Sequence, residues 1–261
     1  MAGIARKYAP HHSGATVRDF NPVSPRFAVQ IHLLESVQAQ NTEVLQMLPQ
    51  LPPVKKYKSL TLIGALILLF YTFQNFIPSI EKLSRPVAYI IVLDVFCLTM
   101  ATFFPELKRD ASVFFRNFST YAKFFFPKFG TFLLIYFVTA ITISVIVGEA
   151  SANQTALQSF PIGILAVMAI VYAPLQEETI YRGFLRRLIP NNECFILVSA
   201  LVFAMIHMLQ PGQTLLQYLY VLEYALLGGF LAWLYVKSDN IFVAMLGHCC
   251  LNLIAFLPML L

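Results

Sequence analysis

Ionisable and amide side chains interrupt the long apolar segments of this sequence at a few positions. The full set is Asp94, Glu177, Glu178, Arg182, His207, Glu223, His248 and Asn252. An ionisable group in an apolar segment is energetically costly, so each of these side chains is a candidate for function. Asp94 is more typical of a structural hydrogen-bonding residue, which leaves the others as the residues whose types could carry out a reaction.

Two pairs within this set supply the groups that hydrolyse an amide bond. A carboxylate and a histidine that share one water molecule can act as a general base and activate it. A second histidine and an amide can donate hydrogen bonds to the oxyanion that develops on the attacked carbonyl. His207 with Glu177 or Glu178 suits the first role, and His248 with Asn252 suits the second. Residue types alone leave the choice between the two glutamates open.

The sequence does not indicate a nucleophilic serine or cysteine. Ser199 is about two turns from His207, and Cys249 points about 100° away from His248 on an ideal helix. The zinc-protease pattern H-E-x-x-H is absent from the sequence. His207, His248 and Glu177 could still form a zinc site of two histidines and one carboxylate. We therefore predict hydrolysis without a metal or other cofactor, with zinc as the alternative.

Chain spacing predicts that the reactive groups share one depth in a helical bundle. Glu177 lies 14 residues before a turn at Asn191, and His207 lies 16 residues after it. At the rise of an α-helix, both side chains sit about 21–24 Å from that turn. His248 lies 9 residues beyond a second turn at Asp239, or about 14 Å deep. We expect these three side chains, from three helices, to converge on one site.

Neighbouring residues are expected to shape this site. Glu178 and Arg182 are four residues apart and can pair along one helix face. Phe203 lies one turn before His207 and would wall the site from lipid. Glu223 is predicted to lie at a similar depth, where it could support the second histidine or simply bond to a neighbouring helix.

The elements that must position these residues are apolar segments of bilayer length, about 20 residues each. The runs are continuous and do not alternate, so a β-barrel is not indicated. Between the second and third segments, residues 108–128 combine aromatic and basic side chains, which predicts an amphipathic helix in the membrane interface. The predicted fold is an all-α, polytopic transmembrane helical bundle of about seven spans, at 60–77, 86–105, 129–148, 162–188, 193–209, 218–236 and 241–260.

The composition excludes an ordinary soluble enzyme. Of the 261 residues, 58% are hydrophobic and 12% are charged, whereas soluble domains average roughly 25% charged residues. Intrinsic disorder is excluded as well, because it requires high charge and low hydrophobicity. The net charge of +5 does not indicate nucleic-acid binding, because the basic residues flank apolar segments and do not cluster on a soluble face.

The distribution of lysine and arginine predicts the orientation in the membrane. Basic residues precede the first, third, fifth and seventh segments, whereas 149–161 and 209–217 contain none. Since basic residues mark cytoplasmic loops, we expect a cytoplasmic N-terminus and an outside C-terminus. We predict that residues 1–54 form a cytoplasmic extension, which could include one amphipathic helix. We predict that residues 55–261 form the transmembrane domain.

Three short motifs on separate apolar segments resemble those of a known family. Residues 177–183 read E-E-x-x-x-R-G, residues 203–207 read F-x-x-x-H, and residues 248–252 read H-x-x-x-N. In this order and spacing they are similar to the motifs of the CAAX protease and bacteriocin-processing (CPBP, or Abi) family. The resemblance covers roughly residues 160–255.

The resemblance implies an intramembrane endopeptidase of the glutamic type, with a wet cavity that opens toward the cytoplasm. Carried over by motif position, Glu177 and His207 would activate the hydrolytic water. His248 and Asn252 would stabilise the oxyanion, while the second glutamate and the arginine of the first motif would shape the site. The choice of Glu177 as the base rests on the resemblance.

The expected partners are the lipid bilayer and a membrane-associated or lipid-linked peptide or protein, with no nucleic acid. Compact size and the lack of an organelle signal favour a prokaryotic cytoplasmic membrane. The alternative functions are a non-proteolytic membrane scaffold or immunity protein and a zinc-dependent version of the same hydrolysis. The sequence does not select a substrate or an oligomeric state.

Overall fold

The computed structural model describes residues 46, 85–151, 154–155, 161–208 and 213–259. These residues belong to one compact unit, Thr42–Leu261. The predicted first span, 60–77, lies outside the described residues, and so does the predicted N-terminal extension apart from residue 46. The remaining predicted spans can be compared with the structure.

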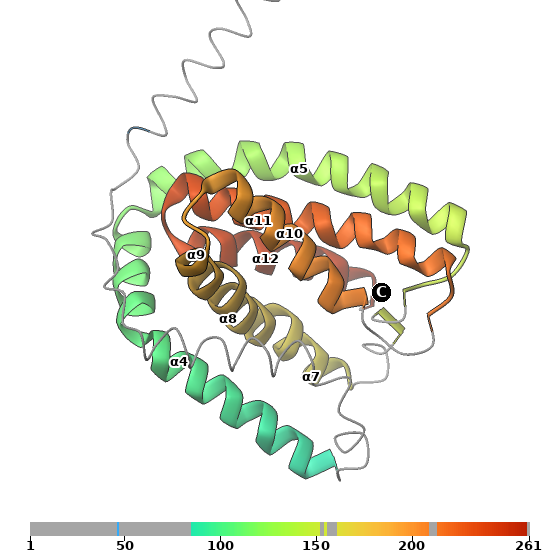
Figure 1. Ribbon diagram of the computed structural model, residues 1–261, viewed down its shortest axis with the longest axis horizontal. Helices are drawn as coiled ribbons and strands as arrows, with labels where there is room; N and C mark the ends of the chain where they lie inside the picture. Colours follow the sequence, from blue (N-terminus) through green and yellow to red (C-terminus); the bar gives the residue numbers. More distant parts are fainter. Residues whose placement is uncertain (1–45, 47–84, 152–153, 156–160, 209–212, 260–261) are drawn as a thin grey trace, which may run out of the picture. The chain divides into compact units, whose positions relative to one another are not determined.

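Every regular element in the described part of the chain is helical, as predicted. The α-helices are α4 (Arg85–Arg116), α5 (Phe118–Val147), α7 (Ile162–Val167), α8 (Ala173–Glu178), α9 (Leu185–Leu188), α10 (Asn192–Met208), α11 (Val221–Ser238) and α12 (Ile241–Phe256) (Figure 1). Two π-helical turns, Met168–Tyr172 and Thr179–Phe184, join α7, α8 and α9 into one helical stretch. Short 3-10 turns precede α11 and follow α12.

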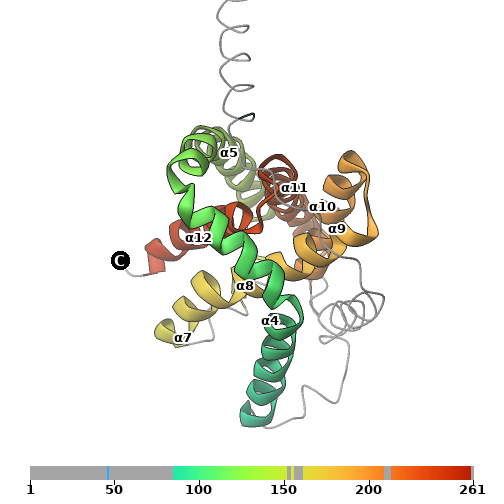
Figure 2. The same cartoon turned by 90° about the vertical axis from the view of Figure 1, so that its left-hand side faces the viewer.

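Helix α12 has neighbours on several sides. It contacts α4, α5, α8 and α11, while α10 packs along α11 (Figures 1 and 2). The core between these helices is mainly aromatic and aliphatic, and it includes the fully buried Phe125, Leu231 and Leu234. Because α12 carries His248 and Asn252, the fold places that predicted pair well inside the helical unit.

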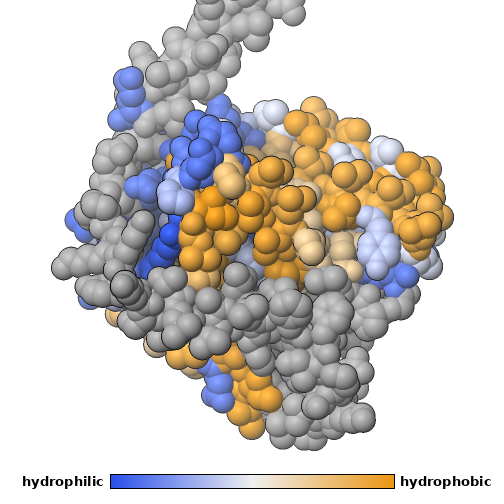
Figure 3. All heavy atoms as spheres, in the orientation of Figure 1, coloured by the Kyte–Doolittle hydropathy of each residue, from blue (hydrophilic) through white to orange (hydrophobic). Residues whose placement is uncertain are grey.

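Three helical stretches of the described chain are long and apolar enough to cross a membrane: 118–147, 162–188 and 216–238. Helices α10 and α12 are apolar but shorter. Apolar side chains also remain on the outside, as on α5, where Val145 is 78% exposed. Figure 3 shows apolar residues over much of the coloured surface, with hydrophilic ones gathered mainly toward one end. These features are those of a membrane protein.

The predicted interfacial helix at 108–128 is not a separate element. Its residues are divided between the last turns of α4 and the first turns of α5, which meet at Asn117. Phe114 packs on Phe242 of α12, and Phe124 stacks on Trp233 of α11 at 5.9 Å between ring centroids. Only part of the aromatic stretch therefore packs inside the protein. Phe114, Tyr121, Phe124 and Phe125 are buried, whereas Phe115, Phe118 and Phe126 remain exposed.

The described helices have two ends that differ in charge. At one end lie the α4–α5 junction, the α9–α10 turn and the α11–α12 turn, with three arginines around one hollow, Arg109, Arg186 and Arg187. We call this the basic end. At the opposite end, which we call the far end, Gln217 donates to the carbonyl of Ala150 and Tyr220 donates to that of Glu149.

Candidate active site

A cavity of about 330 Å³ lies toward the far end, between α5, the 162–188 stretch, α10, α11 and α12. Its walls include six of the predicted site residues, which are Glu177, Phe203, His207, Glu223, His248 and Asn252. The predicted convergence on one layer is therefore confirmed. Two predicted residues, Glu178 and Arg182, are fully buried behind the wall, and Asp94 is exposed on α4.

Glu177 and His207 lie close to each other in the wall of the cavity. Glu177 Oε2 and His207 Nε2 are 3.9 Å apart, which is too long for a direct hydrogen bond. His207 Nδ1 lies 2.8 Å from the carbonyl of Phe203. A carbonyl only accepts, so Nδ1 carries the proton and Nε2 of the neutral ring is an acceptor. Glu177 Oε2 and His207 Nε2 are therefore two hydrogen-bond acceptors that lie next to each other.

Glu178 accepts hydrogen bonds from Arg182 and His248. Its Oε1 accepts from Nη1 of Arg182 at 3.1 Å and from Nδ1 of His248 at 2.8 Å. Arg182 Nε also lies 3.1 Å from Oε2 as part of this ion pair, and Nη2 donates to the carbonyl of Gly228 on α11. The predicted pairing of Glu178 with Arg182 is confirmed. The structure thus distinguishes the two glutamates, because only Glu177 lines the cavity.

The first π-helical turn positions Asn252. Pro174 has no N–H to offer to the carbonyl of Ile170 four residues back, and the N–H of Ala173 bonds Met168 instead of Ala169. Two side chains of α12 donate to the released carbonyls: Asn252 Nδ2 to Ala169 at 2.6 Å, and Cys249 Sγ to Ile170 at 3.2 Å. Asn252 keeps its second amide hydrogen for another acceptor.

The second π-helical turn repeats this arrangement on the other side of the glutamates. The N–H of Leu185 bonds Ile180, five residues back, which releases the carbonyl of Tyr181. Ser199 of α10 lies 3.5 Å from that carbonyl and donates to it. Ser199 is fully buried in this position, so it links α10 to the second π-helical turn.

Phe203 forms the wall between the two histidines. Its ring centroid lies 4.4 Å from that of His207 and 5.9 Å from that of His248, and the guanidinium of Arg182 lies over its face at 4.9 Å. A Cβ at Gly228 would come within 2.8 Å of Phe203 Cβ. Helices α10 and α11 therefore approach so closely that Gly228 has no room for a side chain.

Glu223 bonds to a neighbouring helix, which is one of the two roles predicted for it. Tyr136 of α5 donates to its Oε1 at 2.5 Å, so its hydrogen bond links α11 to α5 and does not support His248. Both residues line the cavity. The next residue in the sequence, Tyr224, contacts His207 directly. Its ring stacks on the imidazole, with the ring centroids 4.7 Å apart and an interplanar angle of 20°.

Sequence reasoning missed the tyrosines of this site. Tyr136, Tyr172 and Tyr224 all line the cavity. With 12 tyrosines in the chain, none stands out by spacing, because an aromatic ring is an ordinary residue in an apolar helix. Only Tyr224 could have been suspected from the sequence, because it directly follows the candidate residue Glu223.

No group of three or more His, Cys, Asp and Glu side chains is placed to hold a metal ion within the described residues. Nδ1 of His248 is directed at Glu178. The alternative zinc site of His207, His248 and Glu177 therefore has no matching cluster there. The cavity wall holds a carboxylate and a histidine 3.9 Å apart, together with a second histidine and an amide.

Comparisons with known proteins agree with the motifs. Residues 158–254 match the family described as type II CAAX prenyl endopeptidase Rce1-like. The chain is also 25% identical over 123 residues to the UPF0177 protein YxdF of Lactococcus lactis subsp. lactis (strain IL1403). That alignment covers 45% of this chain and 65% of the relative, so the chain spans less than two thirds of that protein. No solved structure matches the chain.

Proposed function

We propose, because residues 158–254 match the family described as type II CAAX prenyl endopeptidase Rce1-like, that the protein is an intramembrane endopeptidase of the glutamic type. Its substrate is a membrane-associated or lipid-linked peptide or protein. The observation that carries the proposal is the pair Glu177 and His207, whose acceptor atoms lie 3.9 Å apart across the cavity. A water between them would donate one hydrogen bond to each.

In the proposed reaction this water attacks the carbonyl carbon of the scissile peptide bond. A C–O bond forms, the proton of the water passes to the Glu177–His207 pair, and the carbonyl oxygen becomes an oxyanion. When the C–N bond breaks, the same pair returns a proton to the leaving nitrogen. The atoms balance without a metal ion or a covalent enzyme intermediate.

His248 and Asn252 are the proposed oxyanion donors. In the proposed reaction both ring nitrogens of His248 carry a proton: Nδ1 donates to the Glu178 carboxylate, and Nε2 donates to the oxyanion. Asn252 is held by the carbonyl of Ala169 and offers its remaining amide hydrogen. Donors that are already in place stabilise developing charge without a reorganisation cost.

The test is cleavage of a fluorogenic C-terminal peptide, in prenylated and unprenylated forms, by the purified protein in detergent. We expect Glu177→Gln and His207→Ala to lower kcat/KM at least about 100-fold, as loss of general-base catalysis does. Glu193→Gln is the matched control, because Glu193 is exposed at the start of α10. Full activity in Glu177→Gln would overturn the mechanism.

Two further outcomes would favour the alternatives. If a strong chelator abolishes cleavage and zinc restores it, the hydrolysis is metal-dependent. If the folded protein cleaves neither form of peptide, and Glu177→Gln keeps the cellular phenotype that deletion removes, the protein is a scaffold or immunity protein.

A further inference from the structure

Glu223 lines the cavity of the candidate active site but has no role in the proposed hydrolysis. The residue is 6% exposed. Tyr136 donates to its Oε1, and within the described part of the chain Oε2 has no hydrogen-bond partner. Oε2 is also not one of the fully buried, unpaired atoms of the described residues, so it keeps accessible surface. The second oxygen of this carboxylate is therefore open to the cavity.

The other charges of the site balance each other without Glu223. The ionised groups are two carboxylates and, in the proposed reaction, two cations: Glu177, Glu178, Arg182 and the doubly protonated His248. His207 carries its proton on Nδ1 and is neutral. No lysine or arginine among the described residues lines the cavity. A carboxylate away from bulk water is costly unless a cation or hydrogen-bond donors compensate it.

The far end of the molecule does not supply the missing cation. Ala150 and Gln217, which meet there, belong to the sequence segments 149–161 and 209–217, and neither segment contains a lysine or an arginine. The first segment instead contains Glu149, a further negative charge. A negative potential at the end of the cavity would attract a positively charged ligand.

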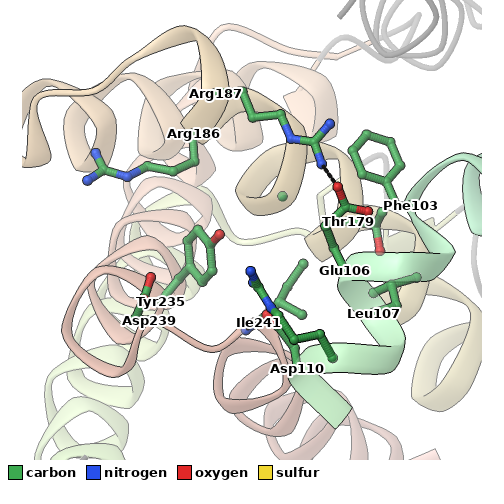
Figure 4. A pocket seen from close by; sticks show the side chains of 12 residues that line it. Phe103, Glu106, Leu107, Asp110, Thr179, Arg186, Arg187, Tyr235, Asp239 and Ile241 are labelled. Carbon is green, nitrogen blue, oxygen red and sulfur yellow. Dashed lines mark hydrogen bonds and ion pairs between the residues drawn. The ribbon is translucent and has the colours of Figure 1, made fainter. Parts of the chain in front are cut away.

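The hollow at the basic end, of about 250 Å³, has the opposite arrangement. Figure 4 shows Glu106 of α4 joined to Arg187 of α9 at one side of it. Its charged lining residues are three acids and three arginines, Glu106, Asp110, Asp239, Arg109, Arg186 and Arg187. Charges are therefore matched within that hollow, whereas the cavity of the candidate active site has one carboxylate in excess.

Aromatic rings lie in the same wall as this carboxylate. Tyr136, Tyr172 and Tyr224 all line the cavity, and the face of an aromatic ring attracts a cation. Tyr224 directly follows Glu223 in the chain and stacks on His207. The carboxylate, the tyrosines and the proposed base therefore belong to one cavity. A carboxylate with aromatic neighbours is suited to a positively charged nitrogen.

We propose that Glu223 binds a lysine or arginine side chain of the substrate, close to the scissile bond. This inference rests on the proposed function, because the scissile bond must lie at Glu177 and His207. The ammonium or guanidinium group donates to Oε2 of Glu223, while Tyr136 keeps its hydrogen bond to Oε1. The bound cation balances the remaining negative charge of the cavity, so the enzyme cleaves next to a basic residue.

The test is cleavage of a mixed library of N-acetylated, C-amidated peptides by the purified full-length protein in detergent, with the products identified by mass spectrometry. The library contains norleucine as an uncharged relative of lysine. Lysine and arginine should be enriched at least about tenfold over norleucine near the cleaved bond, the effect of one hydrogen bond between charged groups. Cleavage without this enrichment would overturn the inference and leave the proposed peptidase in place.

Two variants separate the charge of Glu223 from its structural bond to α5. Glu223→Gln can still accept from Tyr136 but carries no charge, so the enrichment should fall to about one. Tyr136→Phe breaks the bond and keeps the carboxylate, so the enrichment should persist. Glu193→Gln is the charge-matched control and should also keep it. Loss of the enrichment in Tyr136→Phe as well would assign the effect to helix packing and overturn the inference.

A binding measurement decides the inference even if no peptide is cleaved, an outcome that would contradict the proposed function. Fluorescence anisotropy compares two labelled, N-acetylated peptides that differ only in a central lysine or norleucine. The wild type should bind the lysine peptide about tenfold more tightly, and Glu223→Gln should bind both equally. Equal binding by the wild type, or a preference that requires a free amino terminus, would overturn the proposed role of Glu223.

Discussion

Tyr224 links the proposed general base to the far end of the molecule. Its ring stacks on His207, and its hydroxyl lies 3.3 Å from Oγ of the fully buried Ser151. Ser151 Oγ in turn accepts from the N–H of Gln154, which lines the cavity. The orientation of the imidazole is therefore set by a backbone carbonyl on one side and by an aromatic ring on the other.

The first prediction follows from this stacking. Tyr224→Leu should lower kcat of the proposed peptidase about 3- to 10-fold with little change in KM, because an aromatic pair contributes roughly 0.5–1.5 kcal/mol. Tyr224→Phe retains the ring and should keep most of the activity. Steady-state kinetics on the two variants would check this, and equal losses in both would assign the effect to the hydroxyl.

At the scale of the residue, the sequence identified most of the reactive groups but not their partners. The polar side chains Glu177, His207 and His248 could be recognised because such groups are rare in apolar segments. Their hydrogen-bond partners could not be predicted, because several are backbone carbonyls, such as that of Phe203, and every residue has a carbonyl. Glu223 bonds to a neighbouring helix, which is one of the two roles predicted for it, but its partner Tyr136 could not be identified because it is 87 residues away in the chain.

At the scale of the element, the 162–188 stretch departs from a regular α-helix on both sides of Glu177 and Glu178. Each π-helical turn releases backbone carbonyls, and side chains of α10 and α12 bond to them. Such turns are frequent at functional sites. Here they attach two neighbouring helices to the segment that carries the glutamates.

The second prediction concerns Pro174, which prevents a regular helix at the first of these turns. Pro174→Ala restores an N–H that can bond Ile170, so the turn can revert to α-helix and Asn252 loses its anchor. We expect a melting temperature at least as high as that of the wild type, because proline in a helix interior costs about 3 kcal/mol, together with a loss of peptidase activity. Unchanged activity would contradict this role of the turn.

The third prediction concerns the contact between α10 and α11. Gly228→Ala would force Phe203 or the helix backbone to move and should cost about 1–3 kcal/mol of stability. Gly229→Ala is the matched control, because its Cβ would meet Ala200 at an ordinary 3.4 Å and alanine favours the helix. Thermal unfolding of both variants in the same detergent tests the difference. A Gly228→Ala protein as stable as Gly229→Ala would show that the helices adjust freely.

At the scale of the whole molecule, the basic residues and the candidate active site lie at opposite ends of the described helices. The hollow with Arg186 and Arg187 is at the basic end, whereas the cavity of the candidate active site reaches Gln154 and Met259 at the far end. The charge distribution and the resemblance, taken together, predicted a cytoplasmic basic end and a cavity open to the cytoplasm. The geometry places these two features on different sides of the bundle.

The fourth prediction is that the basic residues determine the orientation of the protein in the membrane. The basic end then lies on the cytoplasmic side, and the cavity of the candidate active site lies nearer the outer side. Cys194 at the basic end and Thr214 at the far end are both exposed. In a background without the other cysteines, a membrane-impermeant maleimide should label Thr214→Cys in intact cells and Cys194 only after permeabilisation. The reverse pattern would assign the cytoplasmic side to the far end and agree with the family expectation for the cavity.

The sequence by itself determined the class of the molecule and most of the polar side chains that meet at the candidate site. Apolar runs and scarce charge can belong only to a membrane helix bundle, and helix rise converts residue spacing into depth, so the meeting of Glu177, His207 and His248 was predictable. The tertiary structure alone decided which glutamate faces the cavity, where the aromatic stretch around Phe114 packs, and which carbonyl holds Asn252. These outcomes depend on the rotation of each helix about its axis and on contacts between distant segments, and local spacing does not encode either.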